Sequence, residues 1–281
     1  MTDLAIETRG LTKRFGRVEA VRDLDLHVPT GSVYGLIGAN GAGKTTTIRI
    51  LLGFAAATAG TATVLGLRRG TLPPEPSPDI AYLPDVPELS PWMRPRDALR
   101  FLASLSGVPR DVASDRAAEL LDLVGLRGAV GRVGGFSRGM RQRLGIAAAL
   151  VGRPRLLVLD EPTSALDPFG RADTLAIVRQ LRGHCTVVFT SHLLGDVEAV
   201  CDHVGMLHQG QLLAEGPTDE LLTTHAAPTS SLRIEVPTSE LRPVRDDVLA
   251  LLADRGLPAR ADVEHASLQD VYAHLAGGGA R

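Results

Sequence analysis

The sequence is poor in lysine, in cysteine and in long apolar segments. Only Lys13 and Lys44 are lysine among its 30 basic residues, and Cys185 and Cys201 are its two cysteines. The spacing of the cysteines matches no metal-ligand motif, which favours reduced thiols in a cytosolic protein over a disulfide framework. No stretch approaches 18 uninterrupted apolar residues, so we predict that the chain does not span a membrane by itself.

The charge balance and the N-terminal residues argue against two further classes. The net charge is −2, so no overall positive field favours nucleic acid. The basic cluster of Arg138, Arg141 and Arg143 has no interleaved aromatic residues, and we predict no nucleic-acid partner. The stretch MTDLAIETRGLTKRFG contains acidic residues and no apolar core, unlike a signal peptide.

Apolar patterning divides the 281 residues into parts. Residues 1–35 alternate short apolar strands with turns, and 16–32 is predicted to form strand, turn and strand. Residues 88–150 have helical periodicity. From residue 155 onward, short apolar runs flank a helical stretch, which predicts a parallel sheet. Residues 204–216 are predicted as a hairpin with its turn at Gln209-Gly210.

A polar segment around residues 222–230 predicts a domain boundary. We therefore expect a first domain over 1–222, which includes the helical part at about 88–150. A small α+β domain of strand, helix, strand and helix is expected over 231–276. Residues 277–281 are expected to form a disordered tail.

The scarce lysine Lys44 stands in the stretch LIGANGAGKTTTIRI. Gly38, Gly43, Lys44 and Thr45 fit the pattern G-x-x-x-x-G-K-[ST], between an apolar run typical of a buried strand and a helical pattern. The glycines let backbone N–H groups close on phosphate, and a compact ammonium enters a loop where a planar guanidinium does not fit. The sequence predicts a phosphate-binding loop; the alternative is a glycine-rich turn with a solvated lysine.

A pair of carboxylates completes the chemistry that such a loop needs. In RLLVLDEP, four apolar residues lead into Asp160 and Glu161, at the strand end where open sheets bind ligands. Thr45 can ligate Mg²⁺ and Asp160 can hold the ion through water, while Glu161 can polarise an attacking water. The alternative is a strand that ends in a solvated acidic turn.

The order of further motifs resembles the nucleotide-binding subunit of an ATP-binding cassette (ABC) transporter over about 220 residues. FSRGM occupies 136–140, TSALD follows LLVLDEP at 163–167, and TSH stands at 190–192. The short stretch SLQDVY at 267–272 resembles the end of cassettes that serve ABC-2-type exporters. The resemblance implies an α/β P-loop NTPase (RecA-like) core with an N-terminal antiparallel β part, a helical insertion and a small α+β C-terminal domain.

The resemblance also implies ATP and Mg²⁺ as cofactors, and site roles for residues that match the family motifs. The catalytic residues that it implies are Lys44, Glu161 and His192. The metal ligands that it implies are Thr45, Asp85 and Asp160. The nucleotide contacts are Phe15, Gly38, Asn40, Gly41, Ala42, Gly43, Lys44, Thr45, Thr46, Asp85, Ser137, Gly139 and Asp167. A purely structural His192, or a Phe15 packed in the core, is the alternative at those two positions.

Two departures from the family pattern stand out. The signature LSGGQ appears as FSRGM, so Ser137 and Gly139 are kept while Arg138 replaces the first glycine. Asp85 stands where the family usually carries Gln or Glu. Its shorter carboxylate would reach Mg²⁺ through an extra water, or act in signalling to the helical region; the alternative is a simple turn aspartate.

The function that the resemblance implies is that of an ATPase subunit at the cytoplasmic face of the cell membrane. Two copies would face head to tail and power an exporter through a separate transmembrane permease subunit. The alternatives are a soluble ABC ATPase acting on ribosomes or DNA and a regulatory cassette. The first usually has two cassettes or a long coiled-coil insertion, and the catalytic residues argue against the second.

One aromatic residue lies outside these motifs. Trp92, the only tryptophan, and Met93 stand between Pro91 and Pro95, which predicts a loop or a helix start. A large ring is hard to bury there, and aromatic and methionine side chains are favoured in interfaces. We expect these two residues to line the docking surface for the membrane subunit; burial in the helical core is the alternative.

Overall fold

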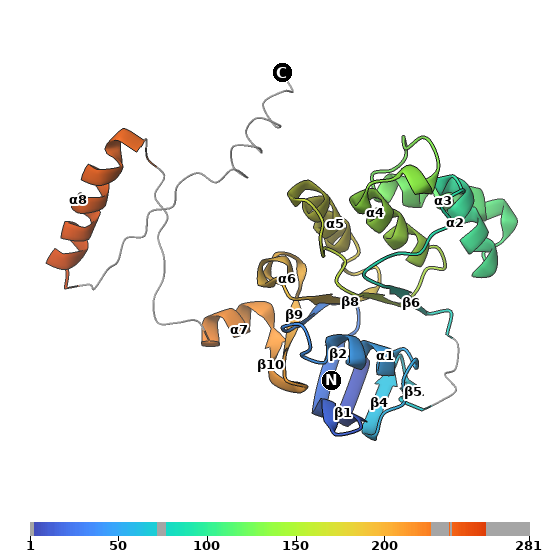
Figure 1. Ribbon diagram of the computed structural model, residues 1–281, viewed down its shortest axis with the longest axis horizontal. Coiled ribbons are helices and arrows are strands. Elements are labelled where there is room, and N and C mark those ends of the chain that lie inside the picture. The colour runs from blue at the N-terminus through green and yellow to red at the C-terminus, as the bar shows by residue number, and fades with distance from the viewer. Residues whose placement is uncertain (1–2, 72–76, 226–235, 237, 257–281) are drawn as a thin grey trace. The chain divides into compact units, whose positions relative to one another are not determined.

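The computed structural model describes residues 3–71, 77–225, 236 and 238–256. The chain divides into two compact units, Met1–Ala226 and Ala227–Arg281 (Figure 1). In the second unit the described residues form the one-turn 3₁₀ helix Thr238–Glu240 and α8 (Leu241–Asp254). The rest of the domain predicted over 231–276, the motif at 267–272 and the tail lie outside the described residues.

An antiparallel sheet of four strands forms the N-terminal part of the first unit, in the order β2-β1-β4-β5. Its strands are β1 (Leu4–Phe15), β2 (Val18–Pro29), β4 (Ala59–Val64) and β5 (Leu67–Arg69). The prediction of strand, turn and strand over 16–32 is wrong, because β2 runs through as one strand. Its backbone bulges at Asp23 (φ 44°), where the register with β1 shifts; a bulge bends a strand without ending its pairing.

A second sheet has six strands in the order β10-β9-β3-β8-β7-β6. They are β3 (Val33–Ile37), β6 (Ile80–Leu83), β7 (Leu156–Leu159), β8 (Thr186–Ser191), β9 (His203–His208) and β10 (Gln211–Pro217). Neighbouring strands from β6 to β9 pair in parallel, and β10 joins β9 as the predicted hairpin. Gln209 and Gly210 both take left-handed conformations in its turn (φ 49° and 83°), which confirms that prediction.

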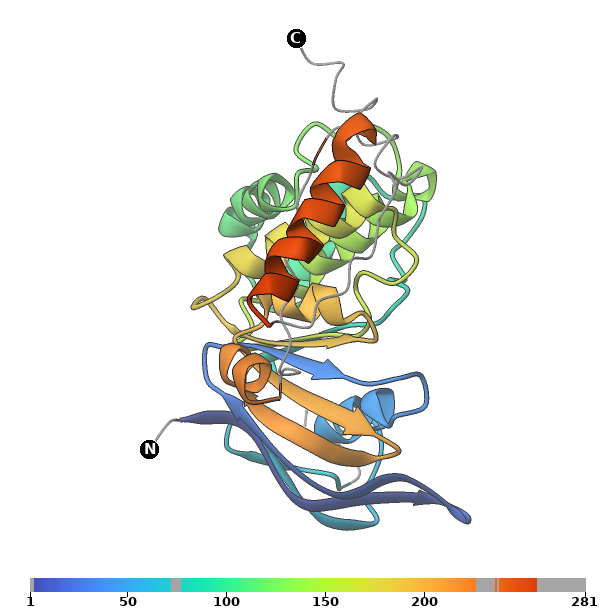
Figure 2. The same ribbon diagram turned by 90° about the vertical axis from the view of Figure 1, so that its left-hand side faces the viewer.

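Helices cover both faces of this sheet. They are α1 (Lys44–Leu51), α2 (Pro95–Leu105), α3 (Arg110–Leu123), the 3₁₀ turn Val133–Gly135, α4 (Arg138–Ala149), α5 (Pro168–Gln180), α6 (Leu194–Val200) and α7 (Thr218–His225). Figures 1 and 2 show α1 and the antiparallel sheet on one side, and α4, α5 and α6 on the other. The continuous apolar runs follow from this layering: Leu156 and Val158 of β7 pack toward the first layer, and Leu157 and Leu159 toward the second.

One close contact between the helical layer and the sheet is made by a glycine of α4. A Cβ atom at Gly145 of α4 would lie 2.7 Å from Leu83 Cδ1 and 2.8 Å from Pro87 Cγ. Only glycine lets α4 come this near to the end of β6 and the segment that follows it. The same contact fixes the surroundings of Asp85, which lies between Leu83 and Pro87.

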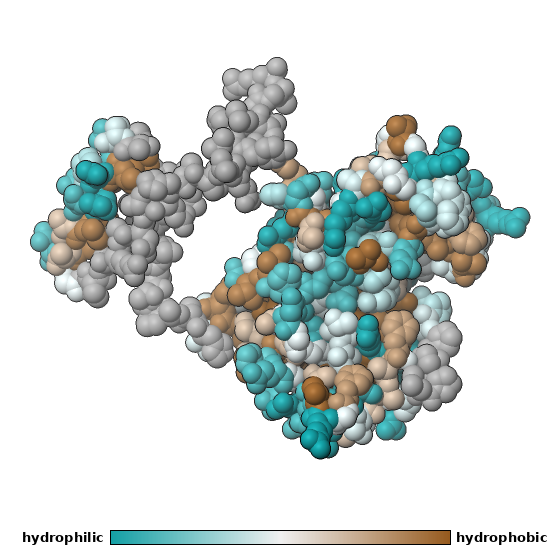
Figure 3. All heavy atoms as spheres, in the orientation of Figure 1, coloured by the Kyte–Doolittle hydropathy of each residue, from teal (hydrophilic) through white to brown (hydrophobic). Residues whose placement is uncertain are grey.

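Cys185 and Cys201 are buried and free. Among the described residues, none of the helices is long and apolar enough to cross a membrane. On the face of the first unit in Figure 3, apolar side chains occur in separate groups among hydrophilic ones. Trp92 is 67% exposed in the turn before α2, so the alternative that it is buried in the helical core is wrong.

Candidate functional site

The loop between β3 and α1 has the geometry that an anion site needs. Gly43 takes a left-handed φ of 106°, and a Cβ there would lie 2.6 Å from the carbonyl oxygen of Ala20. Helix α1 begins at Lys44 without a capping side chain and without an acidic residue in its first turn. Its first N–H groups and its dipole are therefore suited to a negative ligand.

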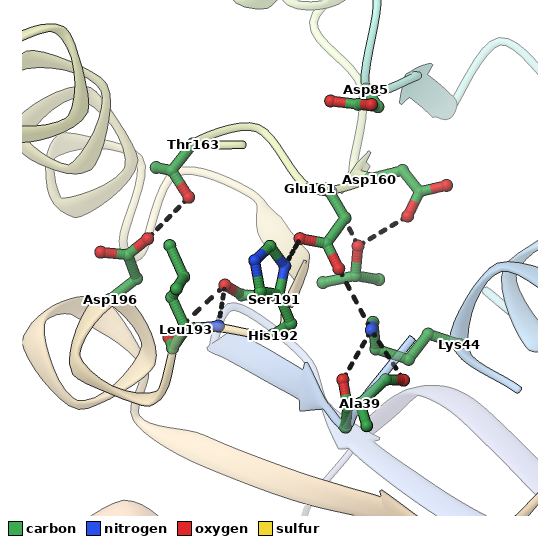
Figure 4. Close-up of polar contacts among 12 residues, drawn as sticks. Ala39, Lys44, Asp85, Asp160, Glu161, Thr163, Ser191, His192, Leu193 and Asp196 are labelled. Carbon is green, nitrogen blue, oxygen red and sulfur yellow. Dashed lines mark hydrogen bonds and ion pairs between the residues drawn. The ribbon is translucent and has the colours of Figure 1, made fainter. Parts of the chain in front are cut away.

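Lys44 is buried at this helix start, with 5% of its surface exposed. Its Nζ donates a 2.7 Å hydrogen bond to the Gly38 carbonyl and lies 3.1 Å from Glu161 Oε1 (Figure 4). The alternative of a solvated lysine is therefore wrong. A buried ammonium must be paired, and here the pair links the loop to the end of β7.

Asp160 is buried directly after β7, which overturns the alternative of a solvated acidic turn. Its Oδ1 accepts a 2.7 Å hydrogen bond from Thr190 Oγ1, and its Oδ2 accepts one of 3.3 Å from the Tyr82 hydroxyl. Burial, with a smaller contribution from the Asp160 charge, raises the pKa of Tyr82 to about 12, so this phenol remains a neutral donor at physiological pH.

Glu161 stands at the centre of the contacts in Figure 4. Its Oε2 lies 2.7 Å from Nδ1 of His192, and its Oε1 faces Lys44. Its backbone N–H donates a 2.8 Å hydrogen bond to Thr190 Oγ1, the same hydroxyl that binds Asp160. Thr190 thus links the end of β8 to both acidic residues at the end of β7. It is the first residue of the TSH motif, but no role of its own was expected for it from the sequence.

The backbone at Glu161 is left-handed, with φ 50°, and Pro162 follows it. Residues other than glycine rarely adopt this region, and a residue before proline is further restricted. Such a conformation persists only where its surroundings hold it, and it is often found at functional sites.

Asp85 lies in the segment after β6, apart from Asp160 and Glu161 (Figure 4). Its Oδ1 is 3.4 Å from Nη2 of Arg138, so the two departures from the family pattern face each other. Burial raises the pKa of Asp85; Arg138 opposes that shift, and the charges of Glu161 and Asp160 add to it. The pKa of Asp85 therefore depends both on the acidic pair after β7 and on Arg138 at the start of α4.

Three further predicted residues lie at the starts of two helices. Ser137 is the N-cap of α4 and accepts from the Met140 N–H at 3.2 Å, and Asp167 caps α5 by accepting from the Gly170 N–H at 2.7 Å. Gly139 approaches Gly170 closely, so these two helix starts are neighbours. Ser137 and Asp167 are exposed.

Phe15 ends β1 with 56% of its surface exposed, which contradicts the alternative of core packing. Its ring centroid lies 4.9 Å from Lys13 Nζ, within the range of a cation–π contact. An exposed ring beside a cation is free to stack on a planar ligand. Lys13, the second lysine of the chain, thus contacts Phe15, the aromatic residue that we expect to stack on the nucleotide.

The oxygen chemistry around the loop fits Mg²⁺. The described residues contain no cluster of three or more His, Cys, Asp or Glu side chains that would form a metal site by themselves. Magnesium, however, is usually held by one or two carboxylates together with substrate phosphates and water. The Asp160 carboxylate and the Thr45 hydroxyl are oxygen donors of this kind, at the end of β7 and the start of α1.

Comparison with known proteins agrees with this geometry. The family model described as ABC transporter matches residues 21–164. The chain is 41% identical to the uncharacterized ABC transporter ATP-binding protein YxlF of Bacillus subtilis, over 78% of this chain and 72% of that protein. It is 40% identical to the bacitracin transport ATP-binding protein BcrA of Bacillus licheniformis, over 77% and 71% of the two chains.

A third relative is the daunorubicin/doxorubicin resistance ATP-binding protein DrrA of Streptomyces peucetius, 39% identical over 82% of this chain and 70% of that one. Among solved structures, an ATP-binding subunit of an ABC transporter superposes with a TM-score of 0.68 at 25% identity, covering 88% of this chain and 99% of that one. A dimeric ATP-binding cassette with bound ADP and phosphate superposes with a TM-score of 0.65 at 21% identity, over 75% and 98%.

Fold and site define a P-loop ATPase of the cassette type. The chain belongs to the ABC transporter family, and it is one of the ATP-binding, ATP-hydrolysing subunits of that family.

Proposed function

We propose that two copies of this chain close on two ATP molecules and thereby drive an exporter whose membrane-spanning subunit is a separate chain. Relatives named for bacitracin transport and for daunorubicin/doxorubicin resistance favour a transporter over an ATPase acting on ribosomes or DNA. The cytoplasmic face of the membrane is the location that we propose for the chain. The dimeric cassette of the same fold supports the pairing of two copies.

One observation carries the proposed chemistry: the Glu161 carboxylate contacts both Lys44 and His192 beside the phosphate-binding loop. Lys44 neutralises phosphate charge, because its ammonium is held in the loop. Glu161 accepts the proton of the attacking water, and His192 orients that water against the γ-phosphate. Thr45 and Asp160 would hold Mg²⁺, with Asp85 contributing through water, and the ion would supply positive charge to the phosphate oxygens.

The other nucleotide contacts would form in two places. The loop residues Gly38, Asn40, Gly41, Ala42, Gly43 and Thr46 would surround the phosphates, and Phe15 would stack on the adenine. Ser137, Gly139 and Asp167 would meet the nucleotide of the second copy. Their position at the exposed starts of α4 and α5 supports such a contact in trans.

A docking role is proposed for Trp92 and Met93. The turn that carries them is held by the 3₁₀ turn before α4, because the Val133 N–H donates a 2.9 Å hydrogen bond to the Met93 carbonyl. A rigid turn with an exposed indole is suited to an interface, where tryptophan is enriched. We propose that this turn contacts the membrane-spanning subunit.

The substitution Glu161→Gln tests the proposed chemistry. It keeps the size of the side chain and removes the base, so ATP binding should persist while turnover falls by ~10²-fold or more. Because closure precedes hydrolysis, the variant should accumulate as an ATP-bound dimer in size-exclusion chromatography. Glu220→Gln, an exposed glutamate of α7, is the matched control. Turnover like that of the unmodified protein in Glu161→Gln would remove Glu161 from the chemistry.

A further inference from the structure

A buried carboxylate outside the predicted site connects the segment that follows Glu161 with the segment that follows His192. Asp196, in the first turn of α6, is only 1% exposed. Its Oδ2 accepts a 2.6 Å hydrogen bond from Thr163 Oγ1, and its Oδ1 accepts from Arg171 Nε in α5. Thr163 is itself buried, so this contact is shielded from water.

A carboxylate in such a place is costly unless its oxygens are paired. Here each oxygen has a partner, one in the loop after β7 and the other in α5. Thr163 lies two residues after Glu161, and Arg171 lies in the first turn of the helix capped by Asp167. Asp196 itself lies four residues after His192.

These positions close a ring of contacts around the proposed base. Glu161 Oε2 meets His192 at 2.7 Å, and two residues further along one segment Thr163 meets Asp196 of the other (Figure 4). On the opposite side, Thr190 Oγ1 holds the Glu161 N–H. The left-handed backbone of Glu161 is therefore restrained both before and after the residue.

We propose that Asp196 is a positioning residue for ATP hydrolysis, which acts through Thr163 and Arg171. The Thr163 contact fixes the backbone after Glu161 against the segment that carries His192. The Arg171 contact fixes the start of α5, and with it the segment 164–167. This inference rests on the roles proposed for Glu161 and His192, because it concerns how that pair is held.

The physical expectation is a loss of turnover without a loss of ATP binding. The phosphate-binding loop lies between β3 and α1, whereas the two partners of Asp196 lie after β7 and in α5. Misplacement of a catalytic group by about 1 Å can lower a rate by ~10²-fold. We expect Thr163→Val, which keeps the shape and removes the hydroxyl donor, to lower kcat by ~10- to 100-fold.

The experiment compares Thr163→Val with Thr163→Ser and Asp196→Asn in the full-length protein. ATP affinity is measured by equilibrium binding, kcat at saturating ATP, and stability by thermal unfolding. The matched control is Thr8→Val, because Thr8 is also fully buried and its hydroxyl bonds the Leu24 carbonyl and the Leu26 N–H in the antiparallel sheet. This control measures what the loss of a buried hydroxyl does to stability alone.

Three results together support the proposal: a lower kcat in Thr163→Val with unchanged ATP affinity, recovery to within about twofold in Thr163→Ser, and unaltered kcat in Thr8→Val. Normal kcat in Thr163→Val overturns it, even if Asp196→Asn fails to fold. Failure of Thr163→Ser to recover, or an equal loss in Thr8→Val, also overturns it. If Glu161→Gln retains full turnover in the same assay, the proposed function fails instead, and the positioning role fails with it.

Discussion

Lysine-to-arginine exchange at Lys44 is a sharp test of why a chain with 28 arginines keeps lysine there. Lys44 is 5% exposed, and its Nζ lies 2.7 Å from the Gly38 carbonyl oxygen and 3.1 Å from Glu161 Oε1. A guanidinium carries the same charge on a larger, planar group with donors in a fixed fork. If charge alone mattered, Lys44→Arg would bind ATP nearly normally.

The structure predicts a severe loss instead, for two reasons. Overpacking typically costs about 1–3 kcal/mol, and where the extra atoms clash only once phosphate fills the loop, this cost corresponds to ~5- to 150-fold weaker binding. Arginine also forms bidentate pairs with carboxylates, so Lys44→Arg would hold Glu161 more firmly and keep it from the attacking water. We therefore expect ATP affinity to fall by ~100-fold, and turnover to fall further.

The assay is equilibrium binding of ATP together with steady-state hydrolysis. Lys13→Arg is the matched control, because Lys13 donates to the Ala56 carbonyl at 2.6 Å and an arginine there keeps a cation beside Phe15. Thermal unfolding without nucleotide should show that Lys44→Arg is folded. ATP affinity within twofold of the unmodified protein would refute the steric reasoning and leave charge as the whole explanation.

Three further predictions concern the surface and the core. Trp92→Ala should leave the melting temperature unchanged, because the ring is exposed, and should lower the yield of co-purified membrane subunit; a large fall in melting temperature with normal co-purification would contradict this. Arg138→Ala should change the free energy of unfolding by less than about 1 kcal/mol, since its 3.4 Å pair with Asp85 is half exposed; denaturant titration measures this. Burial raises the pKa of Cys185 to about 11 and that of Cys201 further, so both should resist a thiol reagent at pH 8 until the protein is unfolded; rapid labelling of the native protein would count against their burial.

Local patterns in the sequence predicted those parts of the site that lie within one segment. Strand, glycine loop and helix around Lys44 follow from residues within a single short stretch, and so does the hairpin turn at Gln209-Gly210. The acidic pair at the end of β7 was visible for the same reason. In each case, spacing along the chain determines the local geometry.

Contacts between segments were not visible in the sequence. Thr163 and Asp196 are 33 residues apart, and Asp85 and Arg138 are 53 apart. Each pair meets only because particular strands and helices become neighbours in the sheet and the helical layer. The bulge at Asp23 escaped prediction too, since a register shift depends on the partner strand.

The close approach at Gly145 gives the helical insertion a mechanical property. A helix that rests on long side chains can slide, because those side chains change rotamer. At Gly145, however, α4 lies directly on Leu83 and Pro87, without a side chain of its own between them. Because packed interiors transmit strain, we expect a tilt of α4 to displace Leu83 and Pro87, which flank Asp85. A larger residue at position 145 would separate α4 from Leu83 and Pro87, and we expect it to displace the segment that holds Asp85.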